Sequence, residues 1–210
     1  MTPRLAMLAM MGVASVASPA LSAQTVRFKL EGVGLTYQEI ADGREGDGGG
    51  GGAGIELRLQ RLHLDVRSVG VRVLMKGDQA DFDLQQVDVR VGYFLTEFLA
   101  LEVGGGRRYI SPDFAAPEVG FVRIGFYSEN HIQRAASVWV RGAYLPDPQF
   151  NTGGSADLSF EFALGVGLGT TNGRFRVHAE YEFQRIDREV NLAAVPLQLS
   201  LARLGIGFGF

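Results

Sequence analysis

Apolar and polar residues alternate with a period of two along most of the chain. The first such segment has Val26, Phe28 and Leu30 at alternate positions, with charged residues between them. A period of two places alternate side chains on opposite faces of a β-strand, so the segment predicts a strand with one apolar and one polar face. Because the pattern returns many times with no helical period between, we predict an all-β protein. The other segments with this pattern are residues 55–73, 87–93, 99–103, 122–126, 138–144, 158–168, 175–183 and 197–210.

Short turns and longer polar loops alternate between these segments. Asn172-Gly173 is a strong signal for a tight hairpin turn. Short turns at one end and long loops at the other are typical of bacterial outer-membrane barrels. Residues 42–54, which include the run Gly48–Gly52, are expected to form an exposed, flexible outer loop. A phosphate-binding loop is not expected there, since a strand and not a helix follows.

The number of strands depends on residues 55–75. Seven strands are expected from residue 82 to the end, and one more over 26–38. The apolar positions in 55–75 change parity near Gln60-Arg61 and again before Val69. We interpret one change as a tight turn and allow one or two β-bulges. Two strands in this region give ten in total, which satisfies the even number of bacterial barrels. One long bulged strand there, with 26–38 outside the wall, would give eight.

The last strand shows most clearly what the alternation is for. Leu204, Ile206 and Phe208 alternate with glycines, and the chain ends on Phe210. Large apolar residues on one face and almost no side chains on the other suit a wall between lipid and a crowded interior. We therefore predict that residues 24–210 form a closed, antiparallel, up-and-down transmembrane β-barrel. The aromatic residues Tyr93, Phe94 and Phe98 at one turn are expected to belong to an interfacial girdle.

The N-terminus and the composition agree with this location. Residues 1–23 carry one basic residue, Arg4, followed by an uncharged run to Ala17 and then small residues. This is the pattern of a cleaved secretory signal peptide, and the run is shorter than the ~20 residues of a membrane anchor. The absence of cysteine excludes disulfides and thiolate metal sites, and three scattered histidines make any metal site unexpected. The balance of 20 basic and 23 acidic residues gives no reason to expect nucleic acid.

The interior is the place to look for chemistry, because every polar alternate position would face it. Both signs of charge occur there, and each unpaired buried charge would cost several kcal/mol, so we expect an ion-paired network. A narrow barrel filled in this way has no open channel and needs no cofactor. The residues expected in the network are Arg90, Glu102, Arg123, Arg141, Glu161, Arg176, His178, Glu180, Glu182 and Arg203.

Two other functions stay open. His178 and Glu180 share a face, with Glu161 and Ser159 on the preceding strand, and a histidine oriented by a carboxylate beside a serine could activate a hydroxyl nucleophile. These residues are weak catalytic candidates for a lipid or peptide hydrolase. A narrow pore or carrier is the third possibility, because glycines thin the interior face of two strands. They stand at positions 165, 167, 205, 207 and 209.

The chain resembles the small outer-membrane barrels of the outer membrane protein A, X and W type. The signal peptide, the alternating hairpins and the terminal aromatic carry the resemblance, which covers the whole mature chain as a pattern and not as a specific motif. It implies a monomer in outer-membrane lipid with a structural or surface-interaction role. It also implies assembly with periplasmic chaperones and the barrel assembly machinery, for which the C-terminal signal would be Leu204, Ile206, Phe208 and Phe210.

With ten strands, the barrel would also resemble the omptin proteases. These enzymes use aspartate pairs and an Asp–His pair near the outer rim. In this sequence the acidic residues near the rim are Asp81 with Asp83 and Asp187 with Glu189. No histidine is placed near them by the pattern. His63 and His131 are expected to be ordinary strand and turn residues.

Overall fold

A computed structural model describes residues 24–210 except 134 and 171–173. The predicted signal peptide, residues 1–23, and the predicted Asn172-Gly173 turn therefore lie outside the described residues. Within the described residues, no helix is long and apolar enough to cross a membrane.

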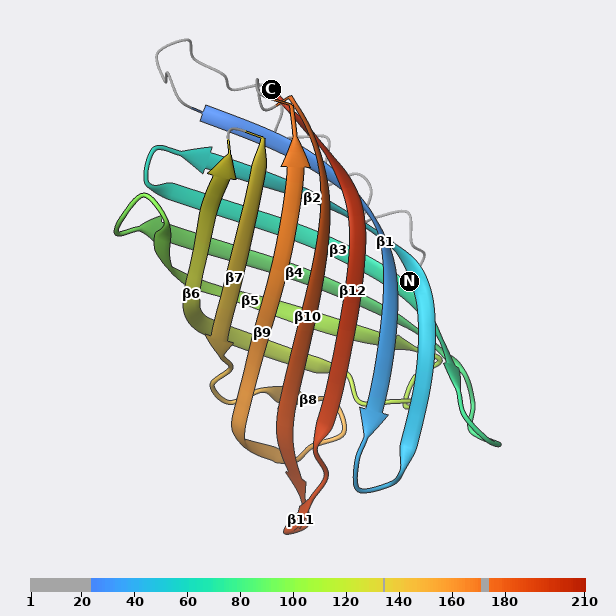
Figure 1. Ribbon diagram of the computed structural model, residues 1–210. Helices are drawn as coiled ribbons and strands as arrows, with labels where there is room; N and C mark the ends of the chain where they lie inside the picture. Colours follow the sequence, from blue (N-terminus) through green and yellow to red (C-terminus); the bar gives the residue numbers. More distant parts are fainter. Residues whose placement is uncertain (1–23, 134, 171–173) are drawn as a thin grey trace.

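Ten long antiparallel strands form one wall (Figure 1). Two further strands of two residues each, β8 (Gln149–Phe150) and β11 (Ala193–Ala194), add short pairings in the loops. The ten wall strands are β1 (Gln24–Glu39), β2 (Arg44–Leu59), β3 (Leu62–Met75), β4 (Phe82–Phe94), β5 (Leu99–Ser111), β6 (Val119–Gln133), β7 (Ala136–Tyr144), β9 (Ser155–Gly169), β10 (Phe175–Val190) and β12 (Leu197–Gly209).

The wall closes because β12 pairs with β1, and every other wall strand pairs with its sequence neighbours. Stepping between paired residues once around the wall from Val26 returns to β1 at Gln38. This stagger of twelve residues, from 26 to 38, inclines ten strands by about 40° to the barrel axis. The predicted ten-strand, closed, antiparallel barrel is confirmed.

We expected the glycine run to be a loop. This expectation was wrong, because the run forms the middle of β2. Residues 46–54 pair with β1 on one side and with β3 on the other without a break. The glycines are needed because the two backbones come very close: a Cβ on Gly50 would lie 1.9 Å from the carbonyl oxygen of Gly70. Glycine in a strand interior commonly marks such a bend or close approach. The period-two pattern missed this strand because it has no side chains there to alternate.

Residues 55–75 contain the predicted tight turn, at Gln60-Arg61, between the end of β2 and β3. The second parity change, before Val69, is not a bulge, because β3 keeps a continuous register with both neighbours. Inward-facing positions simply change from charged residues such as Arg67 to apolar ones such as Val69 and Val71. The parity of the apolar residues changes because the environment changes, while the backbone continues unaltered.

The same inversion divides the whole barrel into two halves. The short-turn half lies toward turns 60–61 and 95–98 and the chain ends, and it is apolar outside and charged inside. The loop half lies toward loops 40–43, 76–81, 112–118, 145–154 and 191–196, and it is polar outside and apolar inside. By the usual orientation of such barrels, the short turns face the periplasm and the long loops face outward.

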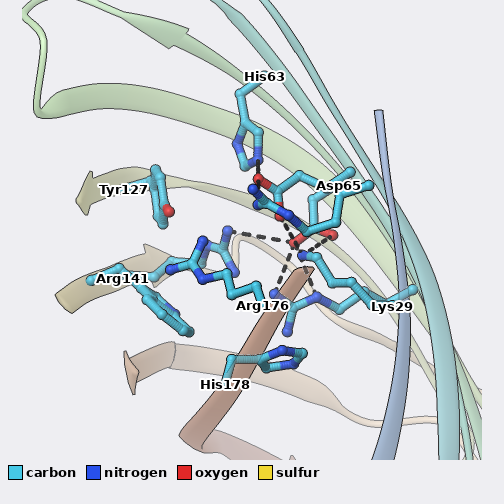
Figure 2. Close-up of a pocket in the computed structure, with 11 residues that line it drawn as sticks. Lys29, His63, Asp65, Tyr127, Arg141, Arg176 and His178 are labelled. Carbon is cyan, nitrogen blue, oxygen red and sulfur yellow. Dashed lines mark hydrogen bonds and ion pairs between the residues drawn. The ribbon is translucent and has the colours of Figure 1, made fainter. Parts of the chain in front are cut away.

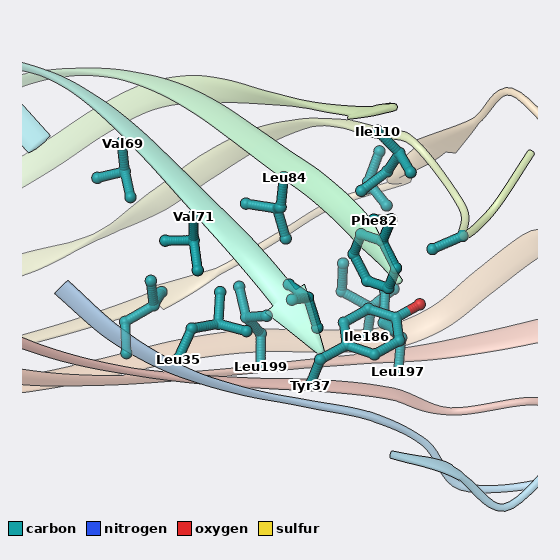
Figure 3. Close-up of a cluster of buried hydrophobic side chains, with 14 of the residues drawn as sticks. Leu35, Tyr37, Val69, Val71, Phe82, Leu84, Ile110, Ile186, Leu197 and Leu199 are labelled. Atoms are coloured by element: carbon teal, nitrogen blue, oxygen red, sulfur yellow. The ribbon is translucent and has the colours of Figure 1, made fainter. Parts of the chain in front are cut away.

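An apolar plug fills the interior of the loop half (Figure 3). Tyr37, Phe82 and Ile186 are fully buried in it, at 0 % exposure, and burial of each large apolar side chain contributes about 1.5–3 kcal/mol. The plug consists of Val33, Leu35, Tyr37, Val69, Val71, Val73, Met75, Phe82, Leu84, Ile110, Ala116, Val119, Phe121, Leu145, Ile186, Leu197, Leu199 and Leu201.

An apolar belt surrounds the exterior of the short-turn half. On β10 it runs from Phe175 to Phe183 at alternate outward positions. The eight residue steps between them, inclined by about 40°, rise roughly 20 Å along the axis, close to the ~25 Å band of outer-membrane barrels. Tyr93 and Phe98 lie exposed at the edge of the belt that faces the short turns, as expected. Phe94 instead points into the lumen and is 3 % exposed. The girdle prediction was therefore wrong for Phe94.

Candidate functional site

The charged lumen of the short-turn half contains all ten residues that the alternation placed there. Nine of them are buried, and Arg176 is partly buried with its side chain 14 % exposed. They come from β4, β5, β6, β7, β9, β10 and β12, which the barrel brings around one axis.

Glu180 lies at the centre of this lumen. Its carboxylate accepts hydrogen bonds from Arg67, from Arg203 at 3.1 Å, and from the Trp139 indole nitrogen at 2.8 Å. Arg203 also contacts Glu182 at 3.0 Å. One carboxylate on β10 thus ties together β3, β7 and β12. Such buried ion pairs are costly to break, because removal of one partner leaves the other charge buried and unpaired.

A second group of pairs extends the network across the remaining strands. Arg90 contacts Glu161 at 2.8 Å, and Arg123 contacts Glu161 at 3.1 Å and Asp88 at 2.8 Å. Arg141 contacts Glu102 at 2.8 Å. Several guanidinium nitrogens, including Nη1 of Arg90 and of Arg123, have no hydrogen-bond partner among the residues that the structure describes. Buried donors of this kind are usually satisfied by ordered water.

A small polar chamber lies among these charges (Figure 2). Lys29 contacts Glu56 at 2.8 Å and Asp65 at 3.3 Å in its wall. The free space is about 20 Å³, enough for about one water molecule. The chamber is therefore a small gap between ion-paired side chains.

The sequence prediction missed several lumen residues, among them Glu56, His63, Asp65 and Arg67. His63, Asp65 and Arg67 alternate with Leu62, Leu64 and Val66, so the same rule that found the other charges would have found them. They were missed because the number and the register of the strands over residues 55–75 were left open.

The arrangement considered for a hydrolase is not formed. His178 contacts Glu31 at 2.9 Å and not Glu180, which is bonded to arginines. Ser159 lies opposite Ile186, eight residues along β10 from His178, so the serine cannot reach the imidazole. Ser159 shares the lumen face with His178 but not its level of the barrel, so the arrangement left open as an alternative is not formed by these residues.

The acidic residues near the rim point outward in ion pairs. Asp83 contacts Arg72 at 3.2 Å, and Asp187 contacts Arg185 at 2.7 Å. Hydrogen bonding to Glu45 raises the pKa of Lys76 in the neighbouring loop. Among residues 24–210 outside the gaps, the three histidines all lie in the short-turn half, away from this rim.

The interior glycines make room for large side chains. A Cβ on Gly165 would lie 2.1 Å from the Trp139 ring, and one on Gly167 would lie 2.2 Å from the Arg176 guanidinium. A Cβ on Gly205 would lie 2.7 Å from the His178 ring. The space that we considered for a pore is thus occupied by protein. In the described part of the chain, no group of three or more His, Asp or Glu side chains could hold a metal ion.

No protein-family profile and no curated protein matches the sequence. Solved structures with a similar fold include the outer membrane protease OmpT from Escherichia coli, at 10 % identity, with a TM-score of 0.52, covering 93 % of this chain and 99 % of that one. Neisserial surface protein A is 13 % identical with a TM-score of 0.48, covering 90 % and 100 %. The attachment invasion locus protein Ail of Yersinia pestis is 12 % identical with a TM-score of 0.42, covering 90 % and 100 %.

The likeness to OmpT concerns the fold, and the belt and lumen of this chain agree with it independently. An apolar exterior band of the height of a membrane, around a polar interior, has no stable place in water. The chain is a small, ten-stranded β-barrel protein of the bacterial outer membrane.

Proposed function

We propose that this protein is a non-conducting barrel that acts through the surface it presents at its loop end. The single observation that carries the proposal is that side chains fill the lumen along its whole length. The short-turn half is closed by the ion-paired network, and the loop half is closed by the apolar plug. A small barrel with such an interior serves as a rigid support in the membrane.

What supports a surface role is the construction of the loop half. Its wall continues beyond the apolar belt with polar residues outside, such as Asp83 and Arg185. The plug makes this projecting part rigid, as the core of a water-soluble barrel would. A non-catalytic role is supported by the separation of the residues considered for catalysis: Ser159 lies opposite Ile186, eight residues along β10 from His178.

Planar-bilayer recording of the purified protein tests the proposal. We expect no steady openings from the wild-type barrel. A triple variant, Leu35→Ala, Phe82→Ala and Leu199→Ala, removes three large plug side chains and serves to find out whether the plug or the charged lumen limits permeation. Liposome swelling in a small sugar gives a second readout. Steady ion-conducting openings in the wild type, at a frequency that scales with inserted protein, would overturn the proposal.

A further inference from the structure

The outer wall has a notch where β7 ends. β7 pairs with β6 only up to the Ile124–Tyr144 pair, and the short strand β8 resumes the pairing at Gly120 and Val119. In the described ladder, residues 121–123 of β6 have no partner on this side. Beside this interruption, over the bare backbone of Gly120 and between Arg107 and Gln149, the outside of the barrel has a hollow of about 250 Å³.

The notch lies at the edge of the apolar belt that faces the long loops. On β5 the outward residues Leu101 and Val103 are apolar, and Arg107 is the second outward residue after them. Arg107 pairs with Gly120 of β6. Gly120 is the next outward position after Val122 in the direction of the long loops. A belt that contacts acyl chains must end where lipid headgroups begin. The notch is therefore at the height of the headgroups of the outer leaflet.

Arg107 differs from the other outward arginines at this height. Arg72 and Arg185 are ion-paired with aspartates on their own wall, at 3.2 Å and 2.7 Å. In the part of the chain that the structure describes, Arg107 has no carboxylate within 4 Å; its guanidinium lies over the Tyr109 ring, 5.0 Å from the centroid. A cation held in place by an aromatic ring, with its donors still available, suits a bidentate contact with phosphate.

The rest of the lining contains polar side chains that suit sugar hydroxyls, together with Val119 and Phe150. Gln149 and Asn151 contribute side-chain amides, and Glu118 contributes a carboxylate. Gly120 forms the floor, where a Cβ would meet nothing within 4 Å. One fixed cation beside amides and a carboxylate, over a bare floor, matches the phosphate and hydroxyl groups of a phosphorylated sugar.

We propose that this notch binds the phosphorylated sugar headgroup of an outer-leaflet glycolipid, with Arg107 on the phosphate. The site goes beyond the proposed non-conducting role and does not depend on it, because it lies on the outside of the wall. Conductance could be found without any change in this binding, and loss of binding would say nothing of the lumen.

The test is a titration of the full barrel in phosphatidylcholine nanodiscs with a bisphosphorylated lipid A glycolipid. Arg107→Gln removes the cation, and Gly120→Val fills the notch in a place where the fold has room. We expect each substitution to weaken binding by about tenfold or more. Arg107→Gln removes a charge-assisted hydrogen bond to the phosphate, and Gly120→Val takes the space of the headgroup. Arg185→Gln is the matched control, since it removes an outward arginine that is already ion-paired; we expect it to leave the affinity unchanged.

Three outcomes would overturn the proposal. Equal weakening by Arg107→Gln and Arg185→Gln would mean a general attraction between basic residues and anionic lipid. Undiminished binding of the dephosphorylated glycolipid would mean that the phosphate is not recognised. Displacement of the glycolipid by inorganic phosphate at equal concentration would mean a plain anion site. Native-like heat-modified mobility on gels establishes that each variant is folded.

Discussion

The two halves of the barrel use opposite solutions to the same geometry. In the short-turn half, side chains that face outward meet lipid and those that face inward meet one another as charges. In the loop half, inward residues such as Leu84 and Leu199 form a dry plug, while their outward neighbours are polar. Both halves share the same strands and the same register.

The difference shows that the polarity of a strand face reports the surrounding medium and not the backbone. β1 carries apolar residues outward up to Leu30 and inward from Val33. The level at which the apolar residues change sides marks the boundary of the membrane. Above it the barrel obeys the rule of a water-soluble protein, with its apolar residues inside. The predictions below test this division, from the largest expected effect to the smallest.

A charge in the plug should prevent folding, whereas the same charge one residue away should be harmless. Leu84 is 0 % exposed in the plug, and its neighbour Gln85 faces outward above the belt. Leu84→Asp would bury a carboxylate without a partner, at a cost of several kcal/mol. We expect no heat-modifiable folded form for Leu84→Asp and a normal one for Gln85→Asp. If Leu84→Asp folds as well as Gln85→Asp, the loop half is not a dry core.

Removal of the central carboxylate should strongly destabilise the short-turn half. Glu180→Ala leaves Arg67, Arg203 and the Trp139 indole without their shared acceptor. We expect the free energy of unfolding to fall by about 3–5 kcal/mol, measured by urea unfolding in phospholipid vesicles. Glu97→Ala, in an exposed turn, is the control and should change it by less than about 0.5 kcal/mol. A loss below 1 kcal/mol for Glu180→Ala would contradict the network.

Much of the fold could be predicted from the sequence because most strands show their two faces. The hairpin of β9 and β10 carries apolar residues at its outward positions over 158–168 and 175–183, and β9 was predicted close to its observed bounds. β10 was predicted to end at Phe183, followed by a loop, but it continues to Val190. β2 could not be predicted in the same way, since its middle consists of glycines. The ten-strand count was nevertheless correct, because an even number of strands required two in residues 55–75, where the apolar positions change parity.

The candidate site was predictable as a set of residues but not as a set of contacts. Alternation places Glu180 and His178 on the inner face, but their partners depend on the stagger of the wall. Because the stagger is twelve residues, side chains that meet across the lumen are far from one another in the ladder. Nothing in the local sequence of β10 indicates that Glu180 meets Arg67 from β3. The notch at Arg107 was not predicted either, since it depends on where β7 stops.

The smallest expected effect is a difference in stability between two alanine substitutions at neighbouring glycines of β2, whose side chains would point to opposite faces of the wall. A Cβ on Gly50 would lie 1.9 Å from the Gly70 carbonyl oxygen, whereas one on Gly49 would lie 3.9 Å from its nearest neighbour, the Val33 carbonyl oxygen. We expect Gly50→Ala to lower the free energy of unfolding by about 1–3 kcal/mol, because the backbone must move. Gly49→Ala should change it by less than about 0.5 kcal/mol. Equal effects of the two substitutions would show that the backbones at Gly50 and Gly70 do not approach this closely.

Trp139 gives this barrel a built-in optical reporter. It is the only tryptophan of the chain, and it is 6 % exposed. Its indole nitrogen bonds to Glu180 on β10, and the Arg176 guanidinium lies 4.7 Å from its ring centre. A cation and an anion fixed around one fluorophore shift its emission in a way that lipid contact alone does not reproduce. Time-resolved fluorescence of the unlabelled protein can therefore separate two events of folding. One is the entry of the strands into the bilayer, and the other is the formation of the contacts of Trp139 with Glu180 and Arg176 in the lumen.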